Sequence, residues 1–375
     1  MSTPSFSLKD QLFNAQSVSM LAHKIAAART DFETQTFIET VIAGFPEREL
    51  KERIAWIREQ LRVFLPTDYR EAMTVILKAL PAPCDPNLSD DDFGDFIYAP
   101  YSDFVAHYGN TAEHLDFSLS ALEEITQRFS AEFALRYFLK TFPEQTLQRL
   151  KVWAHHGHYH VRRLVSEGTR PRLPWGVNVN LSWEQCEPML TALHADSTRF
   201  VQRSVANHLN DWSKTEPERV IALLKSWQDK AQQTPKNLNF MIKHTLRSLI
   251  KAGHPDALTL MGYTPTPEVS VSNLAYTDTV PLGGVLEMSF TLTSHARQKL
   301  VVDYLLYYRN KKGEHAPKTY KIKQLNLAPG DSVTLSKRMP LSQRSTRTLY
   351  AGTHGFALQI NGQLQEKHLF ELTEI

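Results

Sequence analysis

VRRLVSE at residues 161–167 returns twice along the chain in modified form, as VQRSVAN at residues 201–207 and IKHTLRS at residues 242–248. The spacings between these segments are 40 and 41 residues, and each segment follows another one with apolar residues at helical spacing. Helix pairs that repeat about every 40–47 residues are typical of HEAT and armadillo proteins. Since each pair buries its apolar face only against its neighbours, the repeat predicts a solenoid with a long concave surface.

The helical pattern extends over residues 1–263 and then changes. Apolar residues recur every three or four positions in LKDQLFNAQSVSMLAHKIAAA (8–28), LKERIAWIREQLRVFL (50–65), FSLSALEEITQRFS (117–130) and PERVIALLKSWQDKAQ (217–232). From residue 264, seven runs alternate with period two and are separated by turn formers such as NKKG and APGD. We therefore predict two domains, an all-α HEAT-like solenoid at 1–263 and an all-β immunoglobulin-like sandwich at 264–375.

Positive charge gathers in the strand-rich part, although the whole chain carries a formal net charge of only +2. Between residues 309 and 347, ten lysines and arginines face only Glu314 and Asp331, a net charge of +8. Such an excess attracts a polyanion such as DNA. Lysines also protect the edge strands of a sheet from unwanted pairing, and this alternative remains open.

Several classes of protein are not indicated. The N-terminus has neither the basic start nor the apolar core of a secretory signal, and no apolar run approaches 18 residues, so we expect a cytoplasmic protein without membrane contact. GxGxxG, P-loop and HExxH motifs are missing, and we expect no cofactor. The histidines of AHHGHYH (154–160) have no carboxylate among them, which favours surface histidines over a metal site. Cys84 and Cys186 lie far apart and are expected to be buried thiols.

Four residues are candidates for catalysis. Glu167 lies at a helix C-terminus, where the helix dipole disfavours a carboxylate, and Gly168 after it suits the C′ position. Asp211 is also late in its helix. Glu132 lies at a helix start, where an acid needs no function to explain it. Trp175, in a loop after Pro174, is either a core residue or an exposed aromatic, and the sequence alone favours the core.

Arg163, Arg203 and His244 occupy equivalent repeat positions, so we expect a cationic row along one face of the solenoid, with the carboxylates beside it. The alternative for Arg163 and Glu167 is an ordinary i,i+4 surface ion pair, which contributes about 0.2–0.5 kcal/mol.

A family resemblance emerges from five segments taken in order. LKERI (50–54), FSLSALEEITQRFSAEFALRYFL (117–139), HVRRLVSEGTRPRLPWG (160–176), RFVQRSVANHLNDWSK (199–214) and IKHTLRSLIKAGHP (242–255) resemble the AlkC branch of the HEAT-repeat DNA glycosylases. The resemblance covers residues 8–263, and SEGTRPRLPW with SVANHLNDWSK is its most specific part. The strand-rich part is similar to the immunoglobulin-like domain of one subgroup of that family.

The resemblance implies a monofunctional glycosylase that releases 3-methyladenine, and also 3-methylcytosine, from duplex DNA without flipping the nucleotide into a pocket. It implies catalytic roles for Glu132, Glu167, Trp175 and Asp211, no metal, and a monomer. Together with the charge pattern, it leads us to expect DNA contacts from Arg162, Arg163, Arg170, Arg172, Arg203, Lys214, His244, Arg247, Lys311 and Lys312. The competing hypotheses are a non-catalytic DNA- or protein-binding scaffold and a carbohydrate enzyme with paired carboxylates.

Overall fold

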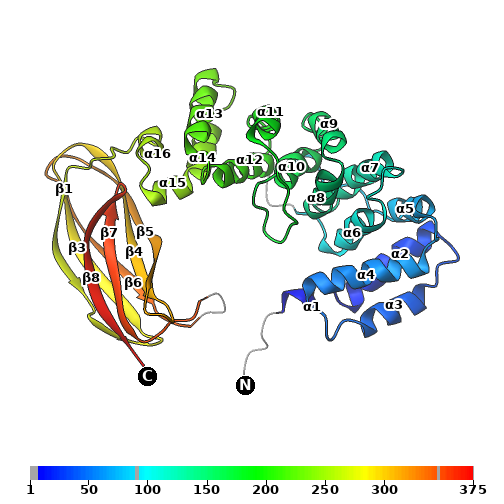
Figure 1. Cartoon of the computed structure of the whole chain (residues 1–375), viewed down its shortest axis with the longest axis horizontal. Helices are drawn as coiled ribbons and strands as arrows, with labels where there is room; N and C mark the ends of the chain where they lie inside the picture. The colour runs from blue at the N-terminus through cyan, green and yellow to red at the C-terminus, as the bar shows by residue number, and fades with distance from the viewer. Residues whose placement is uncertain (1–6, 89–92, 344–346, 375) are drawn as a thin grey trace. The chain divides into compact units, whose positions relative to one another are not determined.

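The computed structural model describes residues 7–88, 93–343 and 347–374. Helices continue to Leu260 and strands begin at Val269, which confirms the all-α part followed by an all-β part (Figure 1). The helices are α1 (Leu8–Leu12), α2 (Ala15–Ala28), α3 (Thr34–Ala43), α4 (Leu50–Phe64), α5 (Tyr69–Lys78), α6 (Ala99–Tyr108), α7 (Leu115–Thr126), α8 (Glu132–Thr141), α9 (Pro143–Trp153), α10 (Tyr159–Gly168), α11 (Trp183–Leu193), α12 (Arg199–Trp212), α13 (Pro217–Lys230), α14 (Pro235–Thr245), α15 (Arg247–Ala252) and α16 (Pro255–Leu260), with the 3-10 turn η1 (Phe96–Tyr98) before α6.

The chain divides into two compact units, residues 1–211 and 212–375. Helices α13 to α16 therefore group with the strands, whereas the boundary expected from the sequence lies at the change from helix to strand, between residues 263 and 264. The two units are described separately.

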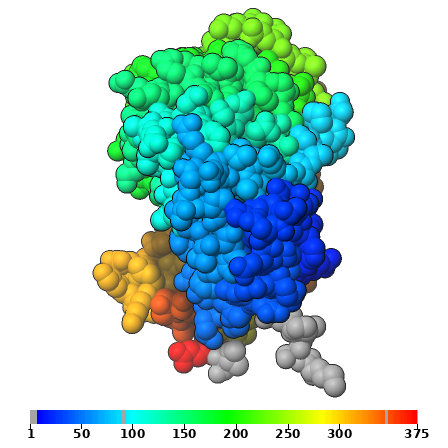
Figure 2. Space-filling view, turned by 90° about the vertical axis from the view of Figure 1, so that its right-hand side faces the viewer, coloured from blue at the N-terminus to red at the C-terminus, as the bar shows by residue number. Residues whose placement is uncertain are grey.

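In the first unit the helices stack in chain order in two rows. Helices α4, α6, α8 and α10 contact one another in succession, and α12 is joined to α10 by hydrogen bonds. A second row lies behind them, in which α5 contacts α7 and α9 contacts α11. The space-filling view shows these helices, coloured blue to green, packed without a break (Figure 2). This arrangement is the helical repeat that the 40-residue spacing predicts.

Local sequence explains two departures from the predicted helices. The run 8–28 is not one helix, because the Asn14 side chain accepts a hydrogen bond from the Ser17 backbone N–H and starts α2 with a capping box. Gly168 does not serve as a left-handed C′ residue, since it is the last residue of α10 and Thr169 caps the helix with φ −95°. A Cβ at Gly168 would lie 2.5 Å from Leu135 Cδ2, so this glycine allows α10 to approach α8 closely.

The strands form two sheets of an immunoglobulin-like sandwich. They are β1 (Val269–Tyr276), β2 (Thr279–Pro281), β3 (Val285–Ser294), β4 (Gln298–Arg309), β5 (His315–Leu327), β6 (Ser332–Pro340), β7 (Gly352–Ile360) and β8 (Gln363–Thr373). One sheet has the order β1-β3-β6 and the other β2-β8-β7-β4-β5. Inward residues such as Leu286, Phe290, Val302 and Phe356 form the core. All seven predicted strands are present, while β2 was missed because three residues are too short to show period two.

Two further predictions concern the burial of the cysteines and the presence of membrane-spanning helices. Cys186 is buried as expected, but Cys84 is only half-buried, and both are free thiols. Among the helices of the described residues, none is both long and apolar enough to cross a bilayer.

Asp303 on β4 is buried on the face of its sheet that is turned away from the sandwich core, with 2% of its surface exposed. Burial raises the pKa of Asp303 from 3.8 to about 6, although Lys321 on β5 and Lys251 on α15 oppose the shift. Between these two pH values the folded chain holds the proton while the unfolded chain releases it, so stability falls as the pH rises through this range.

We predict that Asp303→Asn is more stable than the wild type at pH 7, by about 1–3 kcal/mol, because one pKa unit corresponds to about 1.4 kcal/mol. Urea unfolding at pH 7 and at pH 4 measures this, and the difference should disappear at pH 4, where the Asp303 carboxyl is protonated in the folded chain. Asp278→Asn, which removes the same charge from an exposed position, is the control. A less stable Asp303→Asn protein at pH 7 would contradict the prediction.

Candidate active site: an arginine–carboxylate cluster

Glu167 is the centre of the candidate site, in the last turn of α10. Its carboxylate has 8% of its surface exposed and accepts hydrogen bonds from Arg170 Nη1 at 2.6 Å and Ser204 Oγ at 2.6 Å. Arg163, one turn earlier on α10, places its Nη2 3.8 Å from Glu167 Oε2. The i,i+4 pair therefore exists, but it is buried, and a surface ion pair is the wrong description.

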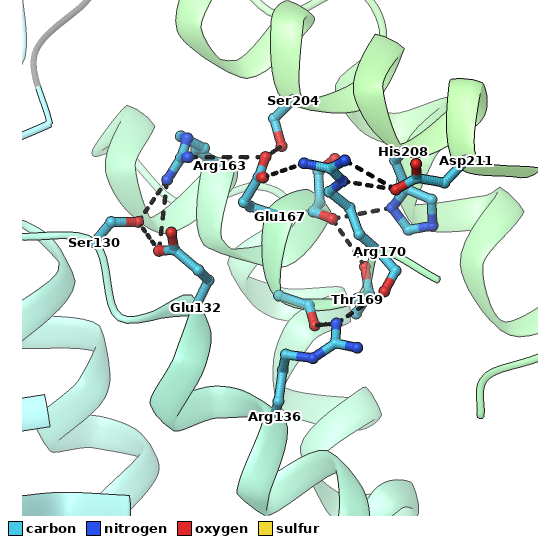
Figure 3. A network of polar contacts seen from close by, with 12 residues as sticks. Ser130, Glu132, Arg136, Arg163, Glu167, Thr169, Arg170, Ser204, His208 and Asp211 are labelled. Atoms are coloured by element: carbon cyan, nitrogen blue, oxygen red, sulfur yellow. Dashed lines mark hydrogen bonds and ion pairs between the residues drawn. The ribbon is translucent and has the colours of Figure 1, made fainter. Parts of the chain in front are cut away.

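Arg170 joins Glu167 to Asp211 (Figure 3). Its Nε and Nη2 both lie 2.9 Å from Asp211 Oδ2, while its Nη1 holds Glu167. Asp211 lies at the end of α12 and is 6% exposed. One guanidinium thus places two carboxylates from different helices on either side of itself, a geometry suited to the five donors of arginine.

Glu132 enters the cluster from the start of α8. It accepts a short hydrogen bond from Ser130 Oγ, and Ser130 Oγ in turn accepts from Arg163 Nη1 at 2.5 Å. Arg163 Nη1 also lies 3.7 Å from Glu132 Oε2. The residue pattern explained Glu132 by the helix dipole and the family resemblance implied a catalytic role, and the tertiary structure adds its place beside Arg163.

Three carboxylates and two guanidiniums are joined in these ion pairs, and the buried guanidinium of Arg136 also interacts electrostatically with Glu167 and Asp211. Burial by itself would raise the pKa of Glu167, but the charges of Arg163 and Arg170 and the Ser204 hydrogen bond outweigh burial, and the pKa of Glu167 is lowered. Burial by itself would lower the pKa of Arg170, but Glu167 and Asp211 outweigh burial and raise it. Glu167 is therefore anionic at neutral pH, and its carboxylate attracts a cation.

The loop after α10 is folded around a buried arginine that sequence reasoning missed. Arg136 on α8 has no exposed surface, and it donates hydrogen bonds to the carbonyls of Gly168 at 2.9 Å, Arg170 at 2.8 Å and Val177 at 2.6 Å. Arg136 thus fixes the backbone of Arg170, whose side chain bridges the carboxylates. The signal was a single charge within the apolar run FALRYFL, which is typical of a buried and fully bonded polar group.

Trp175 is presented outward by this loop. It has 64% of its surface exposed and a left-handed backbone, with φ +69°, so the preference for a core residue was wrong. Lys51 Nζ donates to the Trp175 carbonyl at 2.9 Å and lies 5.6 Å from the centre of its ring. Trp175 also lines a cavity of about 190 Å³ that Ser130, a member of the cluster, lines as well. A strained backbone and an exposed indole beside the cluster favour a functional role.

His208 and Ser204 on α12 were also not among the predicted site residues. His208 is fully buried, and its Nδ1 lies 3.0 Å from the Ser166 carbonyl oxygen. Burial lowers the pKa of His208 to about 4, so the ring is neutral and donates this hydrogen bond from Nδ1. It ties α12 to α10 and sets the distance across which Arg170 reaches Asp211. Their positions in the sequence, within SVANHLND, carried no separate signal.

The predicted cationic contacts fall into three groups. Arg162 lies outside the cluster, because its guanidinium is held by both oxygens of Asp196 at 2.5 and 3.1 Å and by the carbonyls of His156 and Gly157. Arg163 is buried and Arg170 is largely buried, and both are paired with carboxylates, so their contact with phosphates stays a prediction. Arg172 and Lys214 are exposed and Arg203 is half-buried.

The remaining predicted contacts belong to the second unit. His244 and Arg247 are half-buried and line one cavity with residues of the sandwich. Lys311 and Lys312 are exposed in the turn between β4 and β5. Much of the basic segment lies on β5 and β6, which are edge strands of their sheets, so edge protection accounts for part of the charge. Arg344 of this segment lies outside the described residues.

The histidine run has a structural role. His158 and His160 are buried, contrary to the expectation of surface histidines, and the His158 side chain caps α10 by accepting from the His160 N–H at 3.2 Å. Across residues 7–88, 93–343 and 347–374, no three His, Cys, Asp or Glu side chains are grouped to hold a metal ion.

Comparison with known proteins gives this site a context. Residues 99–247 match the family described as DNA alkylation repair enzyme, and residues 270–374 match the C-terminal Ig-like domain of YhaZ. The chain is 31% identical to YhaZ of Bacillus subtilis (strain 168) over 96% of this chain and 98% of that protein. It is similar to the structure of Pseudomonas fluorescens alkylpurine DNA glycosylase AlkC bound to DNA containing an abasic site analog, with 34% identity, a TM-score of 0.87, and coverage of 98% of this chain and 99% of that one.

The chain belongs to the DNA alkylation repair enzyme family. Every member of the arginine–carboxylate cluster, together with Arg136 and Trp175, lies within the part that matches the DNA alkylation repair enzymes. The resemblance stated from the sequence is therefore confirmed at the level of the family, and the roles of individual residues remain predictions.

We predict that Arg136→Met, which keeps the length of the side chain and removes its donors, loosens the loop of this repair-family protein. An unpaired buried carbonyl costs about 1–3 kcal/mol, so the free energy of unfolding should fall by about 3 kcal/mol. Trypsin cleavage after Arg172, followed by mass spectrometry, should become faster. Arg149→Met removes a partly exposed helical arginine and should leave both measurements close to wild type. Equal cleavage of the Arg136→Met and wild-type loops would show that Arg136 does not hold the loop.

Proposed function

We propose that this chain is a monofunctional DNA glycosylase that hydrolyses the bond between an alkylated base and its deoxyribose in duplex DNA, acting as a monomer. The observation that carries the proposal is Arg170 bridging the two buried carboxylates of Glu167 and Asp211. The relative of known activity, an alkylpurine DNA glycosylase with the same architecture bound to DNA, supports both the reaction and the partner.

The carboxylates of the cluster fit the chemistry of an alkylated base. A base alkylated at N3 is already cationic and leaves without a strong general acid, while positive charge grows on the deoxyribose as the bond breaks. A carboxylate about 4 Å from this charge contributes roughly 4 kcal/mol at an effective dielectric constant near 20. If most of this stabilisation arises only in the transition state, it accelerates the reaction by about a thousandfold.

We assign different tasks to the two carboxylates that Arg170 joins. The lowered pKa of Glu167 makes it a poor proton acceptor, so Glu167 stabilises the sugar cation as an anion. Asp211 then orients the attacking water and takes its proton. The water oxygen bonds to C1′, and the base leaves with the electrons of the broken bond. Glu132, joined through Ser130 and Arg163, is proposed to complete the negative field.

Trp175 is proposed to lie against the cationic nucleotide. Its exposed ring already has the Lys51 ammonium 5.6 Å from its centre, which shows that a cation can be accommodated there. Such contacts contribute about 0.5–2 kcal/mol. We propose Arg172, Arg203 and Lys214 as contacts to the DNA backbone.

The preference for 3-methyladenine and 3-methylcytosine, and catalysis without base flipping, are part of this proposal and derive from the family resemblance. A non-flipping enzyme leaves the base in contact with its own duplex, so the carboxylates act on the deoxyribose and need no enclosing base pocket, unlike enzymes that extrude the nucleotide.

We predict that the purified chain releases methylated bases from N-methyl-N-nitrosourea-treated DNA, with 3-methyladenine predominating, as measured by chromatography of the released bases. Glu167→Gln and Asp211→Asn should each slow release by about a thousandfold while DNA affinity is kept, because each removes one anion and retains an acceptor for Arg170. Glu124→Gln in the last turn of α7 and Asp229→Asn late in α13 are matched controls, because they neutralise exposed acids near helix ends.

Intact DNA after long incubation with a protein that binds it would favour the scaffold hypothesis over the enzyme. An unchanged rate for either variant, with unchanged controls, would remove that residue from the catalytic assignment without affecting the other.

We predict that Lys311→Gln with Lys312→Gln weakens binding to duplex DNA and lowers the dependence of affinity on salt. Each lost phosphate contact should reduce the slope of log K against log salt by about 0.9, so the double variant should lose up to about 2. Binding titrations between low and moderate salt measure this, with Lys78→Gln plus Lys140→Gln as the control. An unchanged slope would leave protection of the edge strands as the explanation of the basic segment.

A further inference from the structure

A cavity of about 330 Å³ lies in the second unit, between helices α14 and α15 and strands β4 and β5. No residue that lines it belongs to the arginine–carboxylate cluster. Its size falls within the range of about 300–1,000 Å³ typical of small-molecule sites. It is therefore a second place where this chain can hold a ligand.

The walls of this cavity are held in a fixed arrangement. Lys299 Nζ donates to the Met261 carbonyl at 2.8 Å, and Asn361 Nδ2 donates to the Thr264 carbonyl at 2.9 Å. The backbones of Gly253 and Gly362 meet so closely that a Cβ on either would lie less than 3 Å from the other glycine. Both glycines have left-handed φ values, +77° and +82°, so neither position suits another residue. The helices and the sandwich thus form one preorganised site within this unit.

Asp303 is a buried acceptor without a donor. It lines the cavity with 2% of its surface exposed, and its Oδ1 has no hydrogen-bond partner among the described residues. Gln359, its cross-strand neighbour on β7, is 4% exposed, and its Oε1 also lacks a donor there. The ladder between β4 and β5 is interrupted between Val302 and Asp303, as is common beside binding sites. Since buried polar groups are normally bonded, the Asp303 oxygen in the cavity points to a ligand with hydrogen-bond donors.

The rest of the lining specifies the ligand further. Lys243, Arg247, Lys251 and Lys321 contribute positive charge, which attracts an anion and repels a cationic donor such as a guanidinium or a free amine. Phe240 adds an aromatic wall, on which a planar ring can stack. The ligand therefore combines neutral donors, a planar body and a negative group.

We propose that this cavity binds an unpaired guanine nucleotide, with the base edge donating to Asp303 and the phosphate facing the lysines and Arg247. Guanine carries two adjacent donors, N1–H and the N2 amino group, which match the two oxygens of one carboxylate. Thymine offers a single N–H between two carbonyls, which face a carboxylate unfavourably. The nucleotide is either free in solution or an unpaired residue of a DNA strand. This inference does not depend on the proposed glycosylase activity.

Isothermal titration of the full chain with dGMP, dTMP and inorganic phosphate tests the proposal. We expect dGMP to bind about tenfold to a hundredfold more tightly than dTMP, as charge-assisted hydrogen bonds require, and phosphate to bind more weakly still. Asp303→Asn should abolish the preference for dGMP, while Asp278→Asn keeps it. Lys243→Gln should weaken the binding of dGMP and of dTMP by the same factor, because Lys243 faces the phosphate and is not among the charges that act on Asp303.

The source of the nucleotide is distinguished by two short single strands, one of thymidines and one with a single guanine. If the strand with guanine binds more tightly than the thymidine strand, and Asp303→Asn removes this difference in affinity, the ligand is a DNA residue. If dGMP binds but the two strands have equal affinities, the ligand is the free nucleotide. Thermal unfolding of Asp303→Asn verifies that the variant is folded. Equal affinities for dGMP and dTMP, or a preference that survives Asp303→Asn, would overturn the proposal, as would the lack of any dGMP binding.

Discussion

The candidate active site depends on the ion pairs that the Arg170 guanidinium forms with Glu167 and Asp211. This guanidinium places carboxylates from α10 and α12 on its two sides, and without it Glu167 and Asp211 would be like charges buried close together. Removing one member of a buried ionic group usually costs about 3–5 kcal/mol, because the remaining charges lose their partners. The repeat architecture provides the frame, since the carboxylates come from α8, α10 and α12, which follow one another in the same row of helices. Arg136 provides the precision, since it fixes the backbone from which Arg170 extends.

The need to pair buried carboxylates with positive charge also explains why arginines and acids are mixed in this site. Bare carboxylates repel the phosphates of DNA, yet a site for a cationic base needs negative charge. Carboxylates paired with guanidiniums reconcile these demands, because the total charge is largely neutralised locally while the individual carboxylates stay ionised. Burial then strengthens the electrostatic attraction between each carboxylate and a cation, since water screens a buried charge less than an exposed one. Trp175 adds an uncharged surface for the cationic nucleotide, held outward at the cost of a strained backbone.

The two units use buried charge in different ways. In the first, every carboxylate of the cluster has an arginine partner, so the site is stable before substrate arrives. In the second, Asp303 is buried without a donor among the described residues, and its raised pKa expresses the free energy that burial costs. A carboxylate in the first situation acts through the field of its cluster, and one in the second remains available for a ligand.

The sequence by itself determined the order of helices and strands, the repeat of about 40 residues and the helix-end positions of Glu167 and Asp211, because these depend on local periodicity and on residues close together in the chain. It also carried the family resemblance. It did not show that Arg163 and Arg170 are buried against the acids, that Arg136 holds the loop, or that Trp175 is exposed. The burial of the arginines and the place of Arg136 depend on contacts between segments 31 to 41 residues apart, such as Arg170 with Asp211 and Arg163 with Ser130. Only the tertiary structure decides which charges are buried together, because burial and pairing are properties of the packed helices and not of any one of them.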